Sequence, residues 1–406
     1  MKASRPVWML LLLLLGNGCN EQPVSSITVV RVKAERGDAV AQYSLGLCYY
    51  SGKGVAKDYV EAVKWFRKAA EQGHAKAQNA LGVCYAKGEG VAKDTAEAVK
   101  WYCKAAAQGD AEAQFNLGVC YYKGEGVTKD PVEAVKWFRK AAEQGYAKAQ
   151  NDLGTCYANG VGVTKDAAEA AKWYRKAAEQ GFADAQCSLG VCYYKGEGVT
   201  NDAAEAAKWF RKAAEQGFAQ AQYNLAVCYR DGAGVTKDAA EAVKWYHEAA
   251  EQGYAEAQYN LAVCYRDGMG VTKDSVEAVK CFREAAEQGV AEAENGLGAC
   301  FEEGNGVTKD ATEAAKWFRK AAEQGFAVAQ CNLGLCYAKG EGVTTDYVEA
   351  YKWLSLASAQ GNENAKAAKS SLAQRMTPEQ IAKGFRLARD FKPSRALESG
   401  TSAPSR

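Results

Sequence analysis

The chain has 406 residues, of which 48% are hydrophobic and 25% charged, as in an ordinary folded protein. Its formal net charge of +2 gives no electrostatic reason to expect a nucleic acid or an acidic membrane surface as partner. Only two histidines are present, which limits the proton-transfer and metal chemistry that histidine supplies.

The first residues predict a targeting segment rather than part of the fold. Lys2 and Arg5 precede an apolar run at residues 7–15 that is too short to span a bilayer. This arrangement resembles a bacterial signal peptide, which we place at residues 1–18. We therefore expect an exported protein that is periplasmic, anchored to a membrane as a lipoprotein, or secreted.

A linker is expected at residues 19–26. Gly16 and Gly18 place small residues before Cys19, as a cleavage site requires. The stretch 15–19 also resembles a loose lipobox, in which the cysteine carries a lipid, although Gly16 stands where leucine is usual. Cys19 is thus a possible lipidation site, and we expect membrane contact only through the signal peptide or this anchor.

A repeat of 36 residues fills most of the chain that follows. Glycine returns at this interval ten times between Gly37 and Gly361, and no insertion or gap breaks the register. Residues 38–361 therefore form nine in-phase copies. A leucine also recurs in every copy, as Leu45, Leu81, Leu117, Leu153, Leu189, Leu225, Leu261, Leu297 and Leu333.

Each copy predicts a first helix that ends in a glycine-containing loop. In the first copy, Ala41 and Leu45 lie on one face of a helix over residues 39–51. The segment 52–55 then ends this helix, because glycine adopts the left-handed conformation of a C-cap. Gly46 is glycine or alanine in every copy, which indicates close approach of another helix.

A second helix completes each copy. We expect Asp58 to cap it and Glu61, three residues on, to complete a capping box. Trp65 and Phe66 lie with alanines on its apolar face, and Gly73 turns the chain into the next copy. One such hairpin cannot bury its apolar face alone, whereas stacked neighbours bury a continuous core. The sequence therefore predicts an all-α protein built from nine helix-turn-helix repeats.

Both ends of the array predict degenerate caps. Residues 27–37 look like a degraded second helix and form an N-terminal half-repeat, and residues 362–391 form a C-terminal helical cap. Residues 392–406 contain proline, serine and glycine and are expected to be a disordered tail.

A last helix is expected within the C-terminal cap. Thr377 and Gln380 predict a capping box, with Pro378 at the first helical position. The side chains expected to face the array are Ile381, Phe385 and Ala388.

The repeated pattern, A-x-A-Q-x-x-L-G-x-C-Y-x-x-G-x-G-V-x-K-D-x-x-E-A-x-K-W-x-x-x-A-A-E-Q-G, resembles the Sel-1-like repeat. This family is related to the tetratricopeptide repeat and has a longer loop between its helices. The resemblance implies a right-handed α/α superhelical solenoid of nine 36-residue repeats. It also implies a role in protein–protein interaction, without naming the partner.

Nine of the 14 cysteines occupy one repeat position, which could suggest a metal or redox ladder. Equivalent residues of stacked helices, however, lie about 8–10 Å apart, whereas a disulfide needs Cα atoms within about 7 Å. We therefore interpret these cysteines as small buried hydrophobic residues. They are Cys48, Cys84, Cys120, Cys156, Cys192, Cys228, Cys264, Cys300 and Cys336.

The sequence offers no singular catalytic site. The Gly-x-Gly-Val-x-Lys-Asp loop could suggest a phosphate-binding turn, but it joins two helices nine times over instead of following a strand. His74 and His247 have no recurring companion and are interpreted as incidental. No pair of nucleophile and base stands out, so we predict no enzymatic activity, no cofactor and no metal site.

Partner binding is therefore expected where the copies differ. On the first helix these are the positions equivalent to residues 40, 43, 47, 50 and 51, away from the Leu45 stripe. Resemblance to tetratricopeptide arrays places them in a concave groove, and tyrosine and arginine carry much interface energy. The candidates are Tyr43, Tyr50, Phe115, Tyr122, Tyr194, Tyr223, Arg230, Tyr259 and Arg266.

The expected function is a non-enzymatic scaffold that binds a peptide or protein surface in this groove. Two alternatives remain open. One is a structural spacer whose length is its function, and the other is a cell-wall-associated hydrolase, which would need a site that near-identical repeats do not offer. Neutral variation of an exposed surface would also explain the differences between copies.

Overall fold

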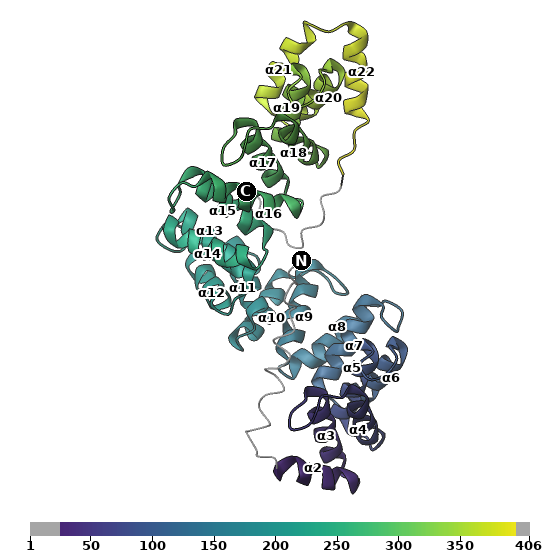
Figure 1. Cartoon of the computed structure of the whole chain (residues 1–406). Coiled ribbons are helices and arrows are strands. Elements are labelled where there is room, and N and C mark those ends of the chain that lie inside the picture. Colours follow the sequence, from purple (N-terminus) through teal and green to yellow (C-terminus); the bar gives the residue numbers. More distant parts are fainter. Residues whose placement is uncertain (1–24, 395–406) are drawn as a thin grey trace. The chain divides into compact units, whose positions relative to one another are not determined.

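The structure, a computed structural model, describes residues 25–394, and all of its regular elements are helices (Figure 1). The signal peptide, the lipidation of Cys19 and most of the disordered tail were predicted for residues outside this part, so they stay predictions. Within residues 25–394, no helix combines the length and the apolar character needed to cross a membrane.

Nine helical hairpins follow one another, which confirms the predicted all-α repeat fold. Their first helices are α3 (Ala39–Ser51), α5 (Ala75–Lys87), α7 (Ala111–Lys123), α9 (Ala147–Asn159), α11 (Ala183–Lys195), α13 (Ala219–Asp231), α15 (Ala255–Asp267), α17 (Ala291–Glu303) and α19 (Ala327–Lys339). Their second helices are α4 (Tyr59–Glu71), α6 (Thr95–Ala107), α8 (Pro131–Glu143), α10 (Ala167–Glu179), α12 (Ala203–Glu215), α14 (Ala239–Glu251), α16 (Ser275–Glu287), α18 (Ala311–Glu323) and α20 (Tyr347–Ala359). α2 (Ser25–Glu35) precedes them, and α21 (Glu363–Ala373) and α22 (Pro378–Arg389) follow.

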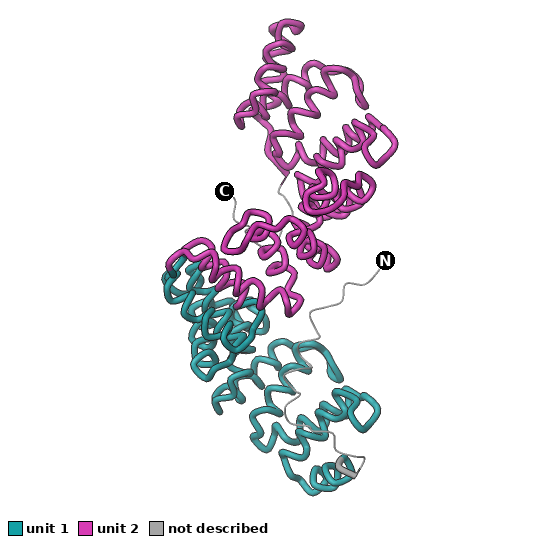
Figure 2. The backbone as a smooth tube through the Cα atoms, turned by 90° about the vertical axis from the view of Figure 1, so that its left-hand side faces the viewer, with its two compact units in different colours: residues 1–185, 197–199 teal, residues 186–196, 200–406 magenta. Residues whose placement is uncertain are grey.

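The described chain divides into two compact units, residues 25–185 with 197–199, and residues 186–196 with 200–394 (Figure 2). In the first, α3 packs on α4, α4 on α5, and so on along the chain. The same order of contacts holds within the second from α12 to α20. Each compact unit is thus a stack of hairpins in which every helix contacts its neighbours in sequence, as in an α/α solenoid.

The predicted apolar positions form the core. The repeated leucine is completely buried in eight copies and nearly so in the ninth, and the alanines and Phe66 of the second helix pack around it. The repeated cysteine belongs to the same kind of cluster: Cys84, Cys156 and Cys264 are all buried among these residues. Burial raises the pKa of the Cys84 thiol to about 12. The interpretation of these cysteines as core residues is therefore confirmed for eight of the nine, while Cys48 in the first repeat is half-buried.

Two glycines of each loop are required for different reasons. Gly52 takes the left-handed conformation with φ 74°, and its N–H donates to the Cys48 carbonyl at 2.8 Å, so it is the predicted C-cap. Gly90, also at positive φ, lies against the preceding hairpin, where a Cβ atom would be only 2.1 Å from the Tyr59 carbonyl oxygen. The loop of one repeat thus closes over the start of the previous second helix.

The second helices are capped by aspartate as expected. The Asp58 carboxylate accepts from the N–H groups of Val60 and Glu61 at 2.9 and 3.0 Å. The reciprocal half of the predicted capping box is wrong, because the Glu61 carboxylate accepts instead from Lys64 Nζ at 2.5 Å. A full capping box does form in α22 between Thr377 and Gln380, with Pro378 in its first turn.

A buried glutamine ties each repeat to the previous one. Gln42 donates from Nε2 to the Ala34 carbonyl at 3.1 Å, and its Oε1 accepts from Gln72 Nε2 at 2.7 Å. Three helix segments are therefore joined through one side chain that lies inside the apolar stripe. The same pair of bonds recurs at Gln78, Gln114, Gln150, Gln222, Gln258 and Gln330.

The C-terminal cap covers the last repeat. α22 packs on α20, where Ser355 and Leu356 stand in place of the arginine and lysine of most other repeats. The contact uses Gly384, which is buried against Tyr351. Phe385 is 58% exposed, so the expectation that it faces the array is wrong: close approach at the neighbouring glycine turns the phenylalanine away.

Candidate protein-interaction surface

Four of the predicted binding residues belong to packed aromatic layers between helices, two of them in each compact unit. Tyr43 lies with its ring centroid 5.9 Å from that of Phe66 on the second helix and 5.0 Å from that of His74 at the start of the next repeat. Phe115, Tyr223 and Tyr259 contact the equivalent second-helix ring at 5.7, 5.9 and 6.0 Å.

These four residues are therefore half-buried rather than free of the core. Burial raises the pKa of Tyr43 to about 12 and also raises that of Tyr223 and Tyr259. The sequence expectation that this position lies away from the packed face is wrong, because its aromatic partners stand 23 and, in three of the four cases, also 31 residues further along the chain. In each compact unit, the positions equivalent to residues 43 and 50 of the first helices form what we call the first-helix surface. The exposed edges of these four residues still contribute to it, but their rings also hold the repeats together.

The position equivalent to residue 50 is more open. Tyr50 donates its hydroxyl proton to Glu89 in the next loop at 2.5 Å, and burial followed by this bond raises its pKa. Tyr122 is 38% exposed, with one edge against Phe138. Tyr194 is half-buried at the same position. Three tyrosines thus stand at the end of the first helix with part of each ring accessible.

Two arginines continue this position in the second compact unit. Arg230 binds Asp231 through Nε and Nη2 at 2.8 and 2.9 Å and donates from Nη1 to Asn260 at 3.2 Å. Arg266 binds Asp267 in the same fork, with both distances 2.8 Å. Its bond to Asp267 raises the pKa of Arg266 and lowers that of Asp267. Both guanidinium groups are therefore held in place on the first-helix surface.

Sequence reasoning missed two sets of polar residues on this surface. Neighbouring first helices are joined by asparagine pairs, in which Asn116 donates to Asn79 at 2.9 Å and Asn332 donates to Asn295 at 3.0 Å. His74 is not incidental: its Nδ1 accepts from the Ala77 N–H at 3.2 Å and caps α5. Aspartate at the same position in other repeats was the signal for this capping role.

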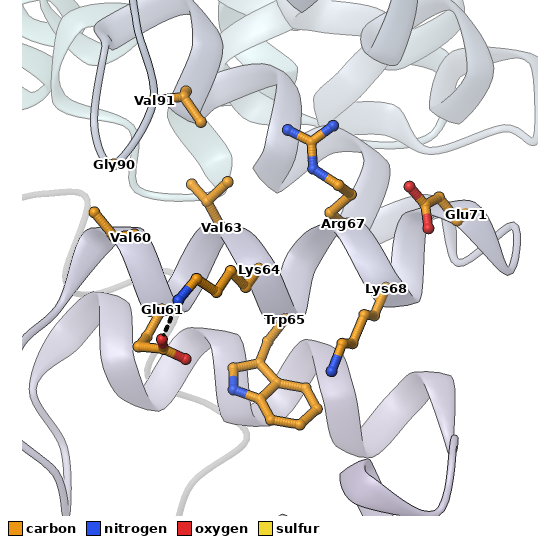
Figure 3. A pocket seen from close by; sticks show the side chains of 10 residues that line it. All are labelled: Val60, Glu61, Val63, Lys64, Trp65, Arg67, Lys68, Glu71, Gly90 and Val91. Carbon is orange, nitrogen blue, oxygen red and sulfur yellow. Dashed lines mark hydrogen bonds and ion pairs between the residues drawn. The ribbon is translucent and has the colours of Figure 1, made fainter.

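The exposed face of the second helices, which we call the outer face, carries residues that repeat from copy to copy. A shallow hollow of about 440 Å³ lies beside α4, with Trp65 and Lys68 on one flank of the helix and Val63 and Arg67 on the other (Figure 3). Lys68 Nζ lies 4.2 Å from the centre of the Trp65 ring. Similar lysine–tryptophan contacts recur in other repeats, where Trp101, Trp173 and Trp209 are buried. On this face, repeated lysines therefore cover buried tryptophan rings.

The described residues 25–394 contain no group of three His, Cys, Asp or Glu side chains arranged as a metal site. The most perturbed carboxyl group of the first compact unit is Asp152, whose pKa burial raises to about 6. It stands beside Asn151, which donates to it at 3.2 Å. Burial, followed by the charge of Asp152, raises the pKa of the Cys156 thiol to about 11, so this pair does not favour a thiolate nucleophile.

Comparison with known families identifies the repeat. The family model described as Sel1 repeat matches nine times in succession, at residues 39–74, 75–110, 111–146, 147–182, 183–218, 219–254, 255–290, 291–326 and 327–362. The chain belongs to the Sel1 repeat family. Each match begins at the first residue of a first helix. Sel1 repeats, like the related tetratricopeptide repeats, are non-enzymatic scaffolds that generally mediate protein–protein interaction.

Two solved structures are similar over long stretches of this Sel1 repeat chain. One is a protective antigen of uropathogenic Escherichia coli with an SLR fold, 35% identical, covering 95% of this chain and 99% of its own, with a TM-score of 0.53. The other is a Sel1 repeat protein of Oxalobacter formigenes, 39% identical, covering 60% of this chain and 96% of its own, with a TM-score of 0.55. The comparison with curated proteins found no match.

Proposed function

We propose that this Sel1 repeat protein binds an extended segment of a partner protein along the first-helix surface. The observation that carries the proposal is the position equivalent to residue 50. It differs between copies although the cysteine and the aromatic residue directly before it recur in every copy, and it presents Tyr122 and Arg266 to solvent. A scaffold that recognises one partner needs such differences, because identical repeats offer identical sites.

The kinds of residue at this position support the proposal. Tyrosine and arginine are enriched among residues that dominate interface energies. The outer face instead repeats a lysine–glutamate pair three residues apart, as in Lys64–Glu61 and Lys136–Glu133. Such exposed pairs contribute little free energy and carry no repeat-specific information. Recognition is therefore assigned to the first-helix surface.

Site-specific photocrosslinking tests this assignment. A photoreactive phenylalanine analogue replaces Tyr122 on the first-helix surface or, as matched control, Lys136 on the outer face of the next helix. In cells that make the full chain, we expect a discrete crosslinked partner from position 122 and at least about tenfold less from position 136, since hot spots concentrate the binding energy. Equal yields of the same species from both positions would contradict the proposal.

A further inference from the structure

A small pocket opens on the first-helix surface of the second compact unit. It has a volume of about 240 Å³ and lies between α15, α16 and α17, with Gly296, Ala299 and Cys300 on one side and Arg266 at its edge. Two residues that line this pocket are smaller than those at the equivalent positions of other repeats. Gly296 stands where other repeats carry asparagine, serine, aspartate or alanine, and Ala299 stands where they carry valine, leucine or threonine.

The preceding repeat shows how the same arginine is bonded when an asparagine is present. Arg230 and Arg266 occupy equivalent positions and are both fixed by a forked ion pair with the next residue. Arg230 uses its remaining Nη1 to donate to the side-chain oxygen of Asn260. The residue equivalent to Asn260 in the next repeat is Gly296. Within the described residues, Arg266 Nη1 therefore donates to no protein acceptor.

Exposure agrees with this difference. The Arg266 side chain is 48% exposed and the Arg230 side chain 38%. Gly296 also packs directly against the Phe282 ring, since a Cβ atom at this position would lie 2.8 Å from Phe282 Cε1. One repeat thus has the donor of the Arg230–Asn260 pair but lacks the side chain that would accept from it.

The charges around the pocket favour a neutral acceptor over an anion. Arg266 is already paired with Asp267. The bond to Arg266 and the charge of Lys273, which also lines the pocket, both lower the pKa of Asp267. Glu303 on the pocket wall accepts from Asn305 and adds a second negative charge. Two cations and two anions therefore balance. An entering carboxylate would meet Asp267 and Glu303, whereas an amide would take the place that Asn260 takes beside Arg230.

We propose that this pocket receives the side-chain amide of an asparagine or glutamine from the bound partner, with the amide oxygen accepting from Arg266 Nη1. This inference rests on the proposed function, because Arg266 occupies in the second compact unit the repeat position that Tyr122 occupies in the first. It adds the chemistry of one contact, a hydrogen bond from the charged Arg266 guanidinium at the pocket edge. A partner side chain without an acceptor cannot make this bond and should bind more weakly.

Capped amino acids test the pocket without knowledge of the partner. N-acetyl-asparagine amide, N-acetyl-aspartate amide and N-acetyl-alanine amide are titrated into the isotope-labelled full chain, and the backbone amide resonances of Ala299 and Cys300 report binding. We expect saturable shifts with the asparagine probe and at least about tenfold weaker binding of the alanine probe, as loss of a hydrogen bond to a charged group predicts. Equal binding of these two probes, or tighter binding of aspartate, overturns the inference.

Three variants make the test specific. Arg266→Ala removes the donor and should abolish the preference for asparagine. Alanine is tolerated at this position, since three other repeats carry it. Gly296→Asn should fill the pocket with the chain's own amide, and Asn260→Gly should open a second responding site beside Arg230. Circular dichroism verifies that each variant is folded. A preference that survives Arg266→Ala sinks the inference, while crosslinking from position 122 would still support the proposed function.

Discussion

Glu294 stands where the other eight repeats carry the buried glutamine that joins neighbouring hairpins. It is 4% exposed and still accepts from Gln324 Nε2 at 2.8 Å. A carboxylate, unlike an amide, cannot donate to the preceding carbonyl. Burial raises the pKa of Glu294 to about 7, against the opposing influence of the Gln324 bond and of Lys320, while Glu323 raises it further. A protonated carboxyl group could donate as glutamine does.

From the raised pKa of Glu294 we predict that the free energy of unfolding falls as pH rises. Because the folded-state pKa lies above the ordinary value of 4.5, the folded chain binds the extra proton between these values. The stabilisation is complete below about pH 4.5 and is lost as pH rises through about 7. Glu294→Gln should remove this slope and stabilise the second compact unit by about 1–3 kcal/mol at pH 8.

Chemical unfolding from pH 4 to pH 8 measures the effect as the difference between variant and parent, which cancels the titration of other groups. Gln222→Glu is the matched control, since it should introduce the same slope into a repeat that lacks it. If Glu294→Gln and the parent keep the same difference in unfolding free energy at all pH values, the assignment of this slope to Glu294 is wrong.

The residue scale also shows the limit of repeat comparison. Variation at Tyr43 and Phe115 indicated freedom from packing, yet both rings stack on a residue at the start of the next repeat. The partner position also varies between copies, as in His74 and Tyr146, so each position alone looks unconstrained. Conversely, the polar Gln42 inside an apolar stripe was a usable signal of a buried hydrogen bond, because burial of an unpaired amide is costly.

At the scale of elements, helices and loops followed closely from the sequence. Caps fix helix ends through local bonds, so the first helix runs over Ala39–Ser51 as predicted and Asp58 caps the second. The close approach predicted at Gly46 is also present, with a Cβ position 2.5 Å from Phe66. What could not be predicted was contact between elements, such as that of Gly384 with Tyr351, because no local pattern encodes it.

The loop contact gives a prediction at this scale. Gly73 and Gly90 both have positive φ, but a Cβ at Gly73 meets nothing within 4 Å whereas one at Gly90 meets the Tyr59 carbonyl. Gly73→Ala should therefore cost about 1–2 kcal/mol for the left-handed conformation alone. Gly90→Ala should cost about 2 kcal/mol more, because the loop must move off the previous helix.

Urea unfolding of the two variants measures this difference directly, with Gly73→Ala as the control for backbone strain. Equal losses of unfolding free energy in the two variants would mean that the loop of one repeat does not depend on its contact with the previous one.

At the scale of the whole molecule, nine matching repeats define the scaffold and leave recognition to their differences. The stack of hairpins was predictable because one pattern repeats without a gap and each copy has an apolar face to bury. The sequence did not predict which of the variable residues are exposed, since their exposure depends on ring contacts between repeats. The residues that remain accessible after packing, Tyr122 and Arg266 foremost, are fewer than those that vary.

The most direct test of partner binding by the first-helix surface is the affinity of a fourfold variant for the crosslinked partner once purified. The variant replaces Tyr122, Tyr194, Arg230 and Arg266 by alanine, which three repeats carry at the same position. A control variant replaces Lys64, Lys136, Lys208 and Lys244 on the outer face by alanine. We predict that the first loses at least about a hundredfold in affinity while its melting temperature and helical signal are retained, and that the second binds as the parent does. Unchanged affinity of the folded fourfold variant would contradict the account.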